Sequence, residues 1–406
     1  MTPVNHRVKH KSTIPANSGT EIELFVREYK ADGSGGTRKP VLMLHGRSVP
    51  ALPCFDLVRP AQGGSPHPDA SYSWAQTLAS KGYDVYIMDL QGSGLSPRPE
   101  MHDPCNANPA PAQRGLLKTN PGTEDCDSTA NYKSQLGNSK SEWGELGTVV
   151  KFIRKRCDNE KVAFIGWSAA AFVMGPYALQ NPEHVASMFL LAPMFPPKGR
   201  WSKNPSDPFA PPPGTPLPDE AVSEPAAVFG FPMNLTSKAA FHAVIPDKDL
   251  ADDVWQAVMD CDSIGQKWGG STPGAPEGVM RWRNTYWWGW NTSTVPHGSA
   301  LGNAVPVCIV YGDEDRTANT PEEMGDVLHF SVPKLYEGIP GADKLMFRVE
   351  GWDHNPVWER KPNQILQHMS WKWLKDQRVY GVESGSWVMD PDGVLEEVAP
   401  VPPPGD

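Results

Sequence analysis

The arrangement of apolar segments along this chain of 406 residues limits its fold more than any other feature. Several short runs are apolar at nearly every position, as in strands buried on both faces of a parallel sheet, and segments with helical spacing separate them. The predicted strands are 40–44, 84–89, 162–165, 187–191, 305–311 and 344–349, and the predicted helices are 72–80, 141–156, 168–180 and 364–374. Strands that alternate with helices predict an α/β fold with a doubly wound, mostly parallel sheet. An earlier segment, 21–28, alternates apolar and polar residues and is predicted to be an antiparallel strand.

The alternation of strands and helices stops after residue 193. Residues 193–218 contain ten prolines, too many for a regular helix or strand, and patches with helical spacing follow, for example 249–259. We interpret this region as an inserted, mainly helical, Pro/Trp-rich cap. The interpretation divides the chain into four parts: 1–193, the first part of the α/β core; 194–300, the cap insertion; 301–377, the second part of the core; and 378–406, a C-terminal tail with a predicted hairpin at 390–393.

Charge and composition restrict the partners that this chain can have. It carries 37 basic and 47 acidic residues, and its net charge of −10 opposes phosphate backbones and anionic lipid headgroups. We therefore expect neither nucleic acid nor a membrane as a partner, and no apolar run approaches the ~20 residues of a membrane helix. The basic start, residues 1–13, lacks the apolar segment of a secretory signal. This favours a cytoplasmic protein, with a secreted protein as the alternative if a presequence has been removed; a homo-oligomer is compatible with either.

The six cysteines form no metal-binding pattern, because the sequence has no CxxC and no Cys/His spacing typical of zinc. We expect no metal, and the sequence implies no other cofactor. Without a glycine-rich phosphate loop, nucleotide and phosphate substrates are disfavoured. Cys105 and Cys126 lie in a loop-like stretch and could pair in an oxidising compartment, whereas Cys308 stands in an apolar strand and is predicted to fill space. The glycosylation sequons at Asn234 and Asn291 matter only if the chain is secreted.

A serine stands between a predicted buried strand and an alanine-rich helix, in the motif GWSAA (166–170). A nucleophile at a sharp turn from strand to helix has strained backbone, so the residues two before it and two after it must be small. Gly166 and Ala170 meet this requirement around Ser168. The motif therefore predicts that Ser168 is a nucleophile, and the alternative is an ordinary helix N-cap.

A serine hydroxyl is a poor nucleophile unless a base accepts its proton, and the base needs a third group that fixes its tautomer. We favour His354 as the base, because the motif GWDHNP (351–356) follows a predicted strand and catalytic groups gather at the carboxyl edge of a parallel sheet. His45 belongs to a different motif, and His297 lies in the insertion.

The third group, a carboxylate that would orient the imidazole of His354, is expected in the motif GDED (312–315). This motif directly follows the predicted strand 305–311. Its three carboxylates are Asp313, Glu314 and Asp315. We prefer Asp315, because it lies one turn beyond the strand and can reach back under an imidazole, whereas Asp313 is expected to hold the loop.

An acyl-transfer site also needs two N–H groups directed at the oxyanion. The turn at the serine supplies the N–H of Ala169. The motif HGRS (45–48) follows the buried strand 40–44, and Gly46 allows its backbone to approach the nucleophile. We therefore predict the Arg47 N–H as the second donor.

Taken together, these motifs resemble the α/β-hydrolase superfamily. The resemblance covers about residues 40–375 without the insertion, and it rests on HGRS, GWSAA, GDED and three further motifs: DLQGSGLS (89–96), NPEHV (181–185) and WDHNP (352–356). It implies a catalytic triad of Ser168, Asp315 and His354, an oxyanion hole made by the N–H groups of Arg47 and Ala169, a cap at 194–300 over the pocket, and a structural role for Asp89. Two features depart from the family pattern: Ala170 replaces a frequent glycine, and the stretch 50–71 is unusually long.

A serine nucleophile predicts an ester or lactone substrate, so the expected function is that of a carboxylic ester hydrolase, a serine esterase or lactonase that works through an acyl-enzyme. Seven of the 15 tryptophans fall between Trp201 and Trp290, which favours a bulky apolar small molecule as ligand. The alternative is that these tryptophans form the core of the cap itself. The candidate substrate-binding residues are Trp167, Trp287, Trp288 and Trp290.

Three other functions use the same scaffold. The enzyme could transfer the acyl group to an alcohol, or cleave a carbon–carbon or cyanohydrin bond with the same triad. The third is a ligand sensor with slow turnover, and the apparently complete set of catalytic groups counts against it.

Overall fold

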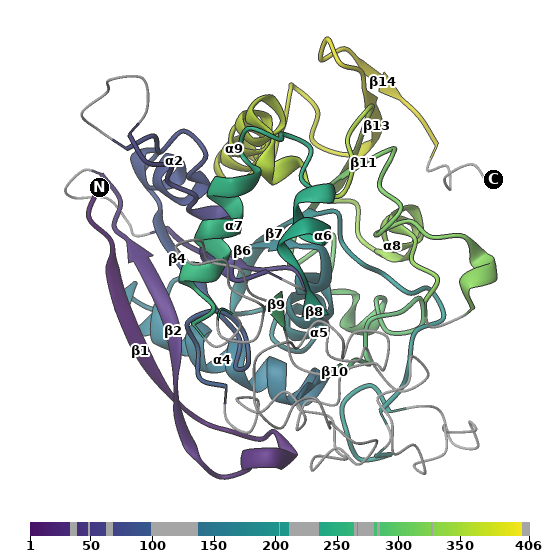
Figure 1. The fold of residues 1–406 in the computed structure, drawn as a ribbon. Helices are drawn as coiled ribbons and strands as arrows, with labels where there is room; N and C mark the ends of the chain where they lie inside the picture. The colour runs from purple at the N-terminus through teal and green to yellow at the C-terminus, as the bar shows by residue number, and fades with distance from the viewer. Residues whose placement is uncertain are drawn as a thin grey trace.

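The computed structural model describes residues 1–32, 39–47, 49–61, 68–98, 137–202, 204–210, 235–263, 266, 280–281, 285–325 and 328–399. Among these residues, ten strands form one sheet in the order β1-β2-β4-β3-β6-β7-β11-β12-β13-β14 (Figure 1). In chain order the strands are β1 (Val4–Lys11), β2 (Glu21–Tyr29), β3 (Pro40–Leu44), β4 (Asp84–Met88), β6 (Val162–Trp167), β7 (Val185–Leu191), β11 (Val307–Gly312), β12 (Lys344–Val349), β13 (Gly385–Met389) and β14 (Leu395–Glu397).

The centre of the sheet is parallel and buried, as the continuous apolar runs predict. Every residue of β3, β4, β6 and β11 is buried, and the pairings from β4 through β3, β6, β7, β11 and β12 to β13 are all parallel. The strand β2 is antiparallel to both of its neighbours, β1 and β4. The predictions of a doubly wound, mostly parallel sheet and of an antiparallel strand near residue 21 are confirmed.

Helices cover the sheet on both sides. The described helices are α1 (Ala51–Phe55), α2 (Trp74–Ser80), α4 (Ser139–Arg156), α5 (Ala171–Gln180), α6 (Lys238–Ala243), α7 (Ala251–Asp260), α8 (Val332–Gly338) and α9 (Arg360–Asp376). The pair α4 and α5 packs together, and α2 packs against α9, where the indole N–H of Trp74 donates to the Ser370 hydroxyl at 2.8 Å. In Figure 1 the strands β4, β6 and β7 run between these two pairs of helices.

Several elements differ from the sequence interpretation. The strand β1 and the helices α1 and α8 were not predicted: β1 carries many basic residues, and α1 and α8 are short and contain proline. The predicted hairpin at 390–393 is present between β13 and β14. However, β13 pairs in parallel with β12, so this part of the predicted tail 378–406 belongs to the main sheet. Its sequence, GSWVM, contains too few apolar residues to mark a sheet strand.

The described part of the region 194–300 contains α6, α7 and four residues that form a short antiparallel pair, β8 (Leu235–Thr236) with β9 (Met280–Arg281). A further pair, β10 (Thr285–Tyr286) with β5 (Gly137–Asn138), joins this region to the start of α4. Two ion pairs hold α7 to the core: Arg59 Nε lies 2.7 Å from Asp253 Oδ2, and the buried Arg98 contacts the buried Asp262. Helix α7 is therefore attached at both ends.

The described cysteines, Cys54, Cys157, Cys261 and Cys308, are buried free thiols, and burial raises the pKa of the Cys308 thiol, as expected for a residue that fills space. Cys105 and Cys126 lie outside the described residues, as does Asn234. In the described part of the chain, no helix is long and apolar enough to cross a membrane.

The second sequon residue, Asn291, is only 2% exposed. Its amide group donates to the carbonyl oxygens of Gly199 and Arg200 and accepts from the N–H groups of Ser293 and Thr294. Asn291 therefore holds two chain segments together.

Candidate active site

Ser168 lies directly after β6, in the turn that leads into α5. Its φ of 57° places it in the left-handed region, which is strained for a residue with a side chain. A Cβ at Gly166 would lie 2.9 Å from Met174 Sδ and 3.2 Å from the Cβ of Ala170, so a side chain at position 166 would crowd both neighbours. The predicted tight turn is present, and Ser168 does not act as a cap: the N-cap residues here are Trp167 and Ala170.

The three predicted catalytic side chains form one hydrogen-bonded chain. His354 Nε2 lies 2.9 Å from Ser168 Oγ, and His354 Nδ1 lies 2.9 Å from Asp315 Oδ2. The other carboxylate oxygen of Asp315 accepts from the backbone N–H groups of Thr317 and Ala318 at 2.8 and 2.9 Å. Since Asp315 is buried and both its oxygens accept hydrogen bonds, it can hold the imidazole in the tautomer that accepts the serine proton.

The loops that carry the acid and the histidine support each other. Asp313 Oδ1 accepts from the Gly351 N–H at 2.8 Å, and the Glu314 N–H donates to the Trp352 carbonyl at 3.1 Å. Asp313 thus holds the loop, as predicted. A Cβ at Gly312 would overlap the carbonyl of Trp352, so glycine is required where the loops cross.

We expect Gly312→Ala to lower the free energy of unfolding by about 3 kcal/mol, because the added methyl group must displace the Trp352 backbone. The displacement also moves His354, and a shift of ~1 Å is expected to lower kcat about 100-fold. Urea denaturation and ester turnover measure the two effects. The matched control is Gly144→Ala in α4, where the nearest atom, His10 Cε1, is 3.7 Å away, and stability should change by less than ~1 kcal/mol. Equal stability of the two variants would contradict the conclusion that the Trp352 backbone leaves no room for a side chain at position 312.

The predicted oxyanion loop lies against the nucleophile. A Cβ at Gly46 would lie 3.1 Å from the Cβ of Ser168, so the loop backbone at residue 46 lies directly against the serine. Asp89 fixes the neighbouring loop, because its two carboxylate oxygens accept from the N–H groups of Ala51 and Leu95, both at 2.8 Å. This is the structural role expected for Asp89.

A cavity of about 310 Å³ opens beside Ser168 and His354. Its other described lining residues, mostly apolar, are Gly46, Arg47, Val49, Trp167, Met194, Thr236, Phe241, Val244, Thr317, Asn355 and Trp358. The rings of Trp167 and Trp358 meet edge to face at 5.3 Å, and Phe241 approaches Trp358 at 5.6 Å. The sequence interpretation named Trp167 but missed the residues of α6 and the Trp358 that follows the WDHNP motif.

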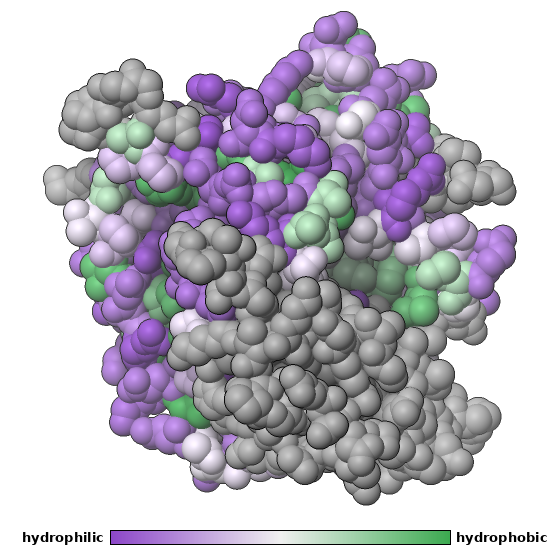
Figure 2. All heavy atoms as spheres, viewed as in Figure 1, coloured by the Kyte–Doolittle hydropathy of each residue, from purple (hydrophilic) through white to green (hydrophobic). Residues whose placement is uncertain are grey.

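The indole N–H groups of the cavity wall are engaged within the protein. Trp167 donates to the carbonyl of His354 at 3.1 Å, and Trp358 donates to the carbonyl of Pro53 at 2.9 Å. The wall therefore presents ring carbon to a ligand. Val244 at the end of α6 lines the cavity and is 53% exposed, so the cavity reaches the surface there. Figure 2 shows small apolar areas, one of them over α6, on a face that is otherwise mainly hydrophilic in its described part.

The other three candidate tryptophans do not line this cavity. Trp288 packs edge to face on Trp143 at 5.7 Å and donates to the Pro208 carbonyl, and Trp290 lies over Gly175. Trp287 stacks on Phe172 of α5 with a centroid distance of 4.5 Å. Their positions match the alternative that they form a core, because each ring is packed against the protein itself.

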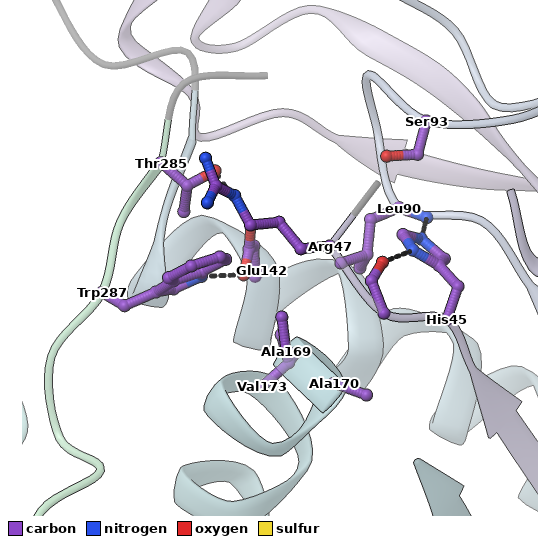
Figure 3. Close-up of a pocket in the computed structure, with 11 residues that line it drawn as sticks. His45, Arg47, Leu90, Ser93, Glu142, Ala169, Ala170, Val173, Thr285 and Trp287 are labelled. Atoms are coloured by element: carbon purple, nitrogen blue, oxygen red, sulfur yellow. Dashed lines mark hydrogen bonds between the residues drawn. The ribbon is translucent and has the colours of Figure 1, made fainter. Parts of the chain in front are cut away.

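A second, much smaller cavity is lined in part by the same predicted oxyanion loop (Figure 3). Gly46 and Arg47 line both cavities. The small cavity has a volume of about 30 Å³ and is further lined by His45, Leu90, Ser93, Glu142, Ala169, Ala170, Val173, Thr285 and Trp287. In Figure 3, Ala169 lies in the turn after β6 and Val173 in α5, and the Trp287 indole N–H donates to Glu142 at 2.7 Å. Burial lowers the pKa of the Arg47 guanidinium.

Next to the histidine loop, Glu359 precedes α9 and is half-buried near Asp353 and Asp247; burial and these two carboxylates raise its pKa to about 7. Because the value in an unfolded chain is near 4.5, the folded protein binds an extra proton between these values, and stability should fall as pH rises from about 4.5 to 7. We expect Glu359→Gln to weaken this dependence, measured as the urea midpoint across that range. The exposed Glu350→Gln serves as control. Equal pH dependence of the Glu359→Gln variant and the unchanged protein would contradict the prediction.

Within the described residues, no group of three or more His, Cys, Asp or Glu side chains is arranged to hold a metal ion. The groups joined to Ser168 are an imidazole and, through it, a buried carboxylate, and such a hydrogen-bonded chain is a component of nucleophilic catalysis at a carbonyl.

Comparisons with known proteins place the chain in a family. No curated protein matches the sequence. Among solved structures, a thioesterase domain from the curacin biosynthetic pathway is 13% identical with a TM-score of 0.46, over 85% of this chain and 95% of that one. A thermophilic esterase from Thermogutta terrifontis is 14% identical with a TM-score of 0.41, over 91% and 98%. A monoacylglycerol lipase from Paleococcus ferrophilus is 14% identical with a TM-score of 0.39, over 87% and 98%. The family model of the alpha/beta hydrolase fold matches residues 39–361, and the chain belongs to this family.

Proposed function

We propose that the protein is a serine hydrolase that cleaves an ester or lactone of a bulky apolar small molecule through an acyl-enzyme. The observation that carries the proposal is the hydrogen-bonded chain from Ser168 through His354 to Asp315, with 2.9 Å at each step. The tight turn at Ser168 and the close approach of Gly46 support it, because both place backbone next to the serine, where N–H groups can stabilise an oxyanion.

In the proposed cycle, His354 Nε2 accepts the proton of Ser168 Oγ as the oxygen attacks the carbonyl carbon. The N–H groups of Arg47 and Ala169 stabilise the oxyanion, and His354 then gives the proton to the departing alcohol oxygen. Water enters beside His354, loses a proton to it and attacks the acyl carbon. The bond to Ser168 Oγ breaks, and His354 returns the proton to the serine. Asp315 stays ionised and orients the imidazole throughout.

The lining of the large cavity favours an apolar substrate. Trp167, Trp358 and Phe241 present ring carbon, and the polar side chains beyond the catalytic ones are few. Serine as the nucleophile favours an ester or lactone, because water at the acyl carbon regenerates the hydroxyl.

A fluorophosphonate probe tests the proposal. We expect the probe to label the native protein at Ser168, identified by peptide mass spectrometry, and to leave Ser168→Ala unlabelled. The matched control, Ser80→Ala, changes an exposed serine that donates to the Thr77 carbonyl at the end of α2, and it should label like the native protein. Equal labelling of Ser168→Ala, or no labelling of the native protein, would remove the proposal.

A further inference from the structure

We propose that Asn355 determines how well bulky esters bind, because it fastens helix α6, a part of the wall of the large cavity, to the loop that carries His354. Asn355 is in this sense a positioning residue: it acts on the substrate through α6 and takes no part in the bond changes. The inference rests on the proposed function and adds to it a residue that determines selectivity.

Helix α6 and its C-cap residue contribute Phe241 and Val244 to the lining of the large cavity. The helix has only six residues, and so short a helix is not stable in water without contacts to the rest of the protein. The shape of this wall therefore depends on the contacts that hold α6 in place.

Some of these contacts lie within the inserted region, where α6 packs beside α7 (Figure 1). Lys238 Nζ lies 3.0 Å from Asp252 Oδ1, and the rings of Phe241 and Trp255 are 5.4 Å apart. After the helix, the ammonium group of Lys248 donates to the carbonyls of residues 242, 243 and 245. These contacts join α6 to α7 and complete its last turn, but they do not reach the loop that carries His354.

A hydrogen bond and a ring contact join α6 to the histidine loop, which we define as residues 350–359. The side-chain amide of Asn355 donates to the carbonyl of Val244 at 3.2 Å. The ring of Phe241 meets the ring of Trp358 edge to face at 5.6 Å. Of these two contacts, the hydrogen bond is the directional one, so it fixes the distance between the end of α6 and the loop.

The backbone of Asn355 is itself held by the loop. Its N–H donates to Asp353 Oδ1 at 2.6 Å, and its carbonyl accepts from the Trp358 N–H at 3.1 Å. The preceding residue, His354, is bonded to Asp315 Oδ2 at 2.9 Å. A side chain on such a fixed backbone loses little freedom when it bonds to α6. Asn355 can therefore keep the wall at a constant distance from the reacting groups.

Loss of this hydrogen bond should affect binding and leave the chemical step unchanged. A bulky ester contacts the wall in the ground state and in the transition state alike, so a looser wall raises KM without a change in kcat. An ester that is too small to reach α6 does not respond. The expected signature is an effect on KM that grows with the size of the ester.

Ethyl, benzyl and 2-naphthylmethyl acetates test the inference on the full-length protein, because only the alcohol part grows along this series. In Asn355→Ala, KM for 2-naphthylmethyl acetate is expected to rise about 5-fold, with kcat and both constants for ethyl acetate within about 2-fold. The matched control is Asn303→Ala. It removes an exposed amide that donates to the Ser299 carbonyl at 2.8 Å, away from the residues that line the cavity, and should change neither constant.

A second variant and a second measurement make the test independent of one substitution. Asn355→Leu keeps nearly the same size without the donor and without a new charge, and the same rise in KM is expected. Hydrogen–deuterium exchange of the peptide 238–245 reports the attachment of α6 without any substrate. We expect exchange about 3-fold faster in both Asn355 variants and unchanged in Asn303→Ala. Circular dichroism checks the fold of the three variants.

An unchanged KM for 2-naphthylmethyl acetate would overturn the inference, and so would an equal rise for all three esters or unchanged exchange of α6. If the fluorophosphonate labels Ser168 and one of these results is obtained, the serine hydrolase remains and the role of Asn355 is wrong. If Ser168 is not labelled and none of the three acetates is cleaved, the proposed function fails and the inference fails with it.

Discussion

Replacing Ser168 with alanine is expected to lower kcat for benzyl acetate by about 10⁶-fold, and His354→Ala should lower it by a similar factor. In the proposed cycle the two side chains act as one unit, because Ser168 Oγ attacks only while His354 Nε2, 2.9 Å away, takes its proton. The double variant should therefore lose no more activity than either single variant. Residual turnover would come from the oxyanion donors and the binding of the ester.

Steady-state kinetics at substrate saturation measure these losses. The control for the histidine is His297→Ala, which removes an exposed imidazole in the inserted region and should leave kcat within about 2-fold. Losses in the single variants that multiply in the double variant would mean that the two groups act independently, which contradicts the proposed proton transfer.

Asp315→Asn is expected to lower kcat by about 10⁴-fold with little change in KM. The carboxylate accepts from His354 Nδ1 through one oxygen and from the N–H groups of Thr317 and Ala318 through the other. An asparagine that keeps its oxygen toward the two backbone N–H groups presents its NH₂ to the imidazole. His354 Nδ1 then has to accept a hydrogen bond, and Nε2 carries the proton and cannot act as base.

The matched control is Asp313→Asn, two residues earlier in the same loop. Its carboxylate accepts from the Gly351 N–H and does not contact the imidazole, and an amide oxygen can replace it in that hydrogen bond. We expect kcat to fall less than ~10-fold and thermal stability to decrease slightly. A larger kinetic effect at 313 than at 315 would assign the acid to Asp313.

The sequence was sufficient to predict the central, parallel part of the sheet and the position of the three polar groups that meet at Ser168. Parallel strands bring their carboxyl ends to one edge, so short motifs after three predicted strands had to lie together. Gly166 and Ala170 allowed the turn to be recognised, and the distance along the chain from Ser168 to His354 did not matter because β6, β7, β11 and β12 are successive neighbours in the sheet.

The substrate cavity was harder to predict, because its wall is assembled from segments that no local pattern connects. Phe241 and Val244 reach the site through the six-residue helix α6, which is held in part by a hydrogen bond from Asn355 to the Val244 carbonyl at 3.2 Å. The environment of the tryptophans in the inserted region was hard to predict for a related reason. The ring partner of Trp287, Phe172, and its hydrogen-bond partner, Glu142, are more than a hundred residues earlier in the chain.

The strands that precede and follow residues 194–300, β7 and β11, are neighbours in the sheet, with Leu191 opposite Val310 and the Ala192 N–H bonded to the Val310 carbonyl at 2.7 Å. Because the two strands are parallel, the chain leaves the core at the carboxyl end of β7 and returns at the amino end of β11. The residues between the two strands therefore start at the edge of the sheet that carries Ser168 and have to reach the opposite edge before β11 brings the chain back to Asp315.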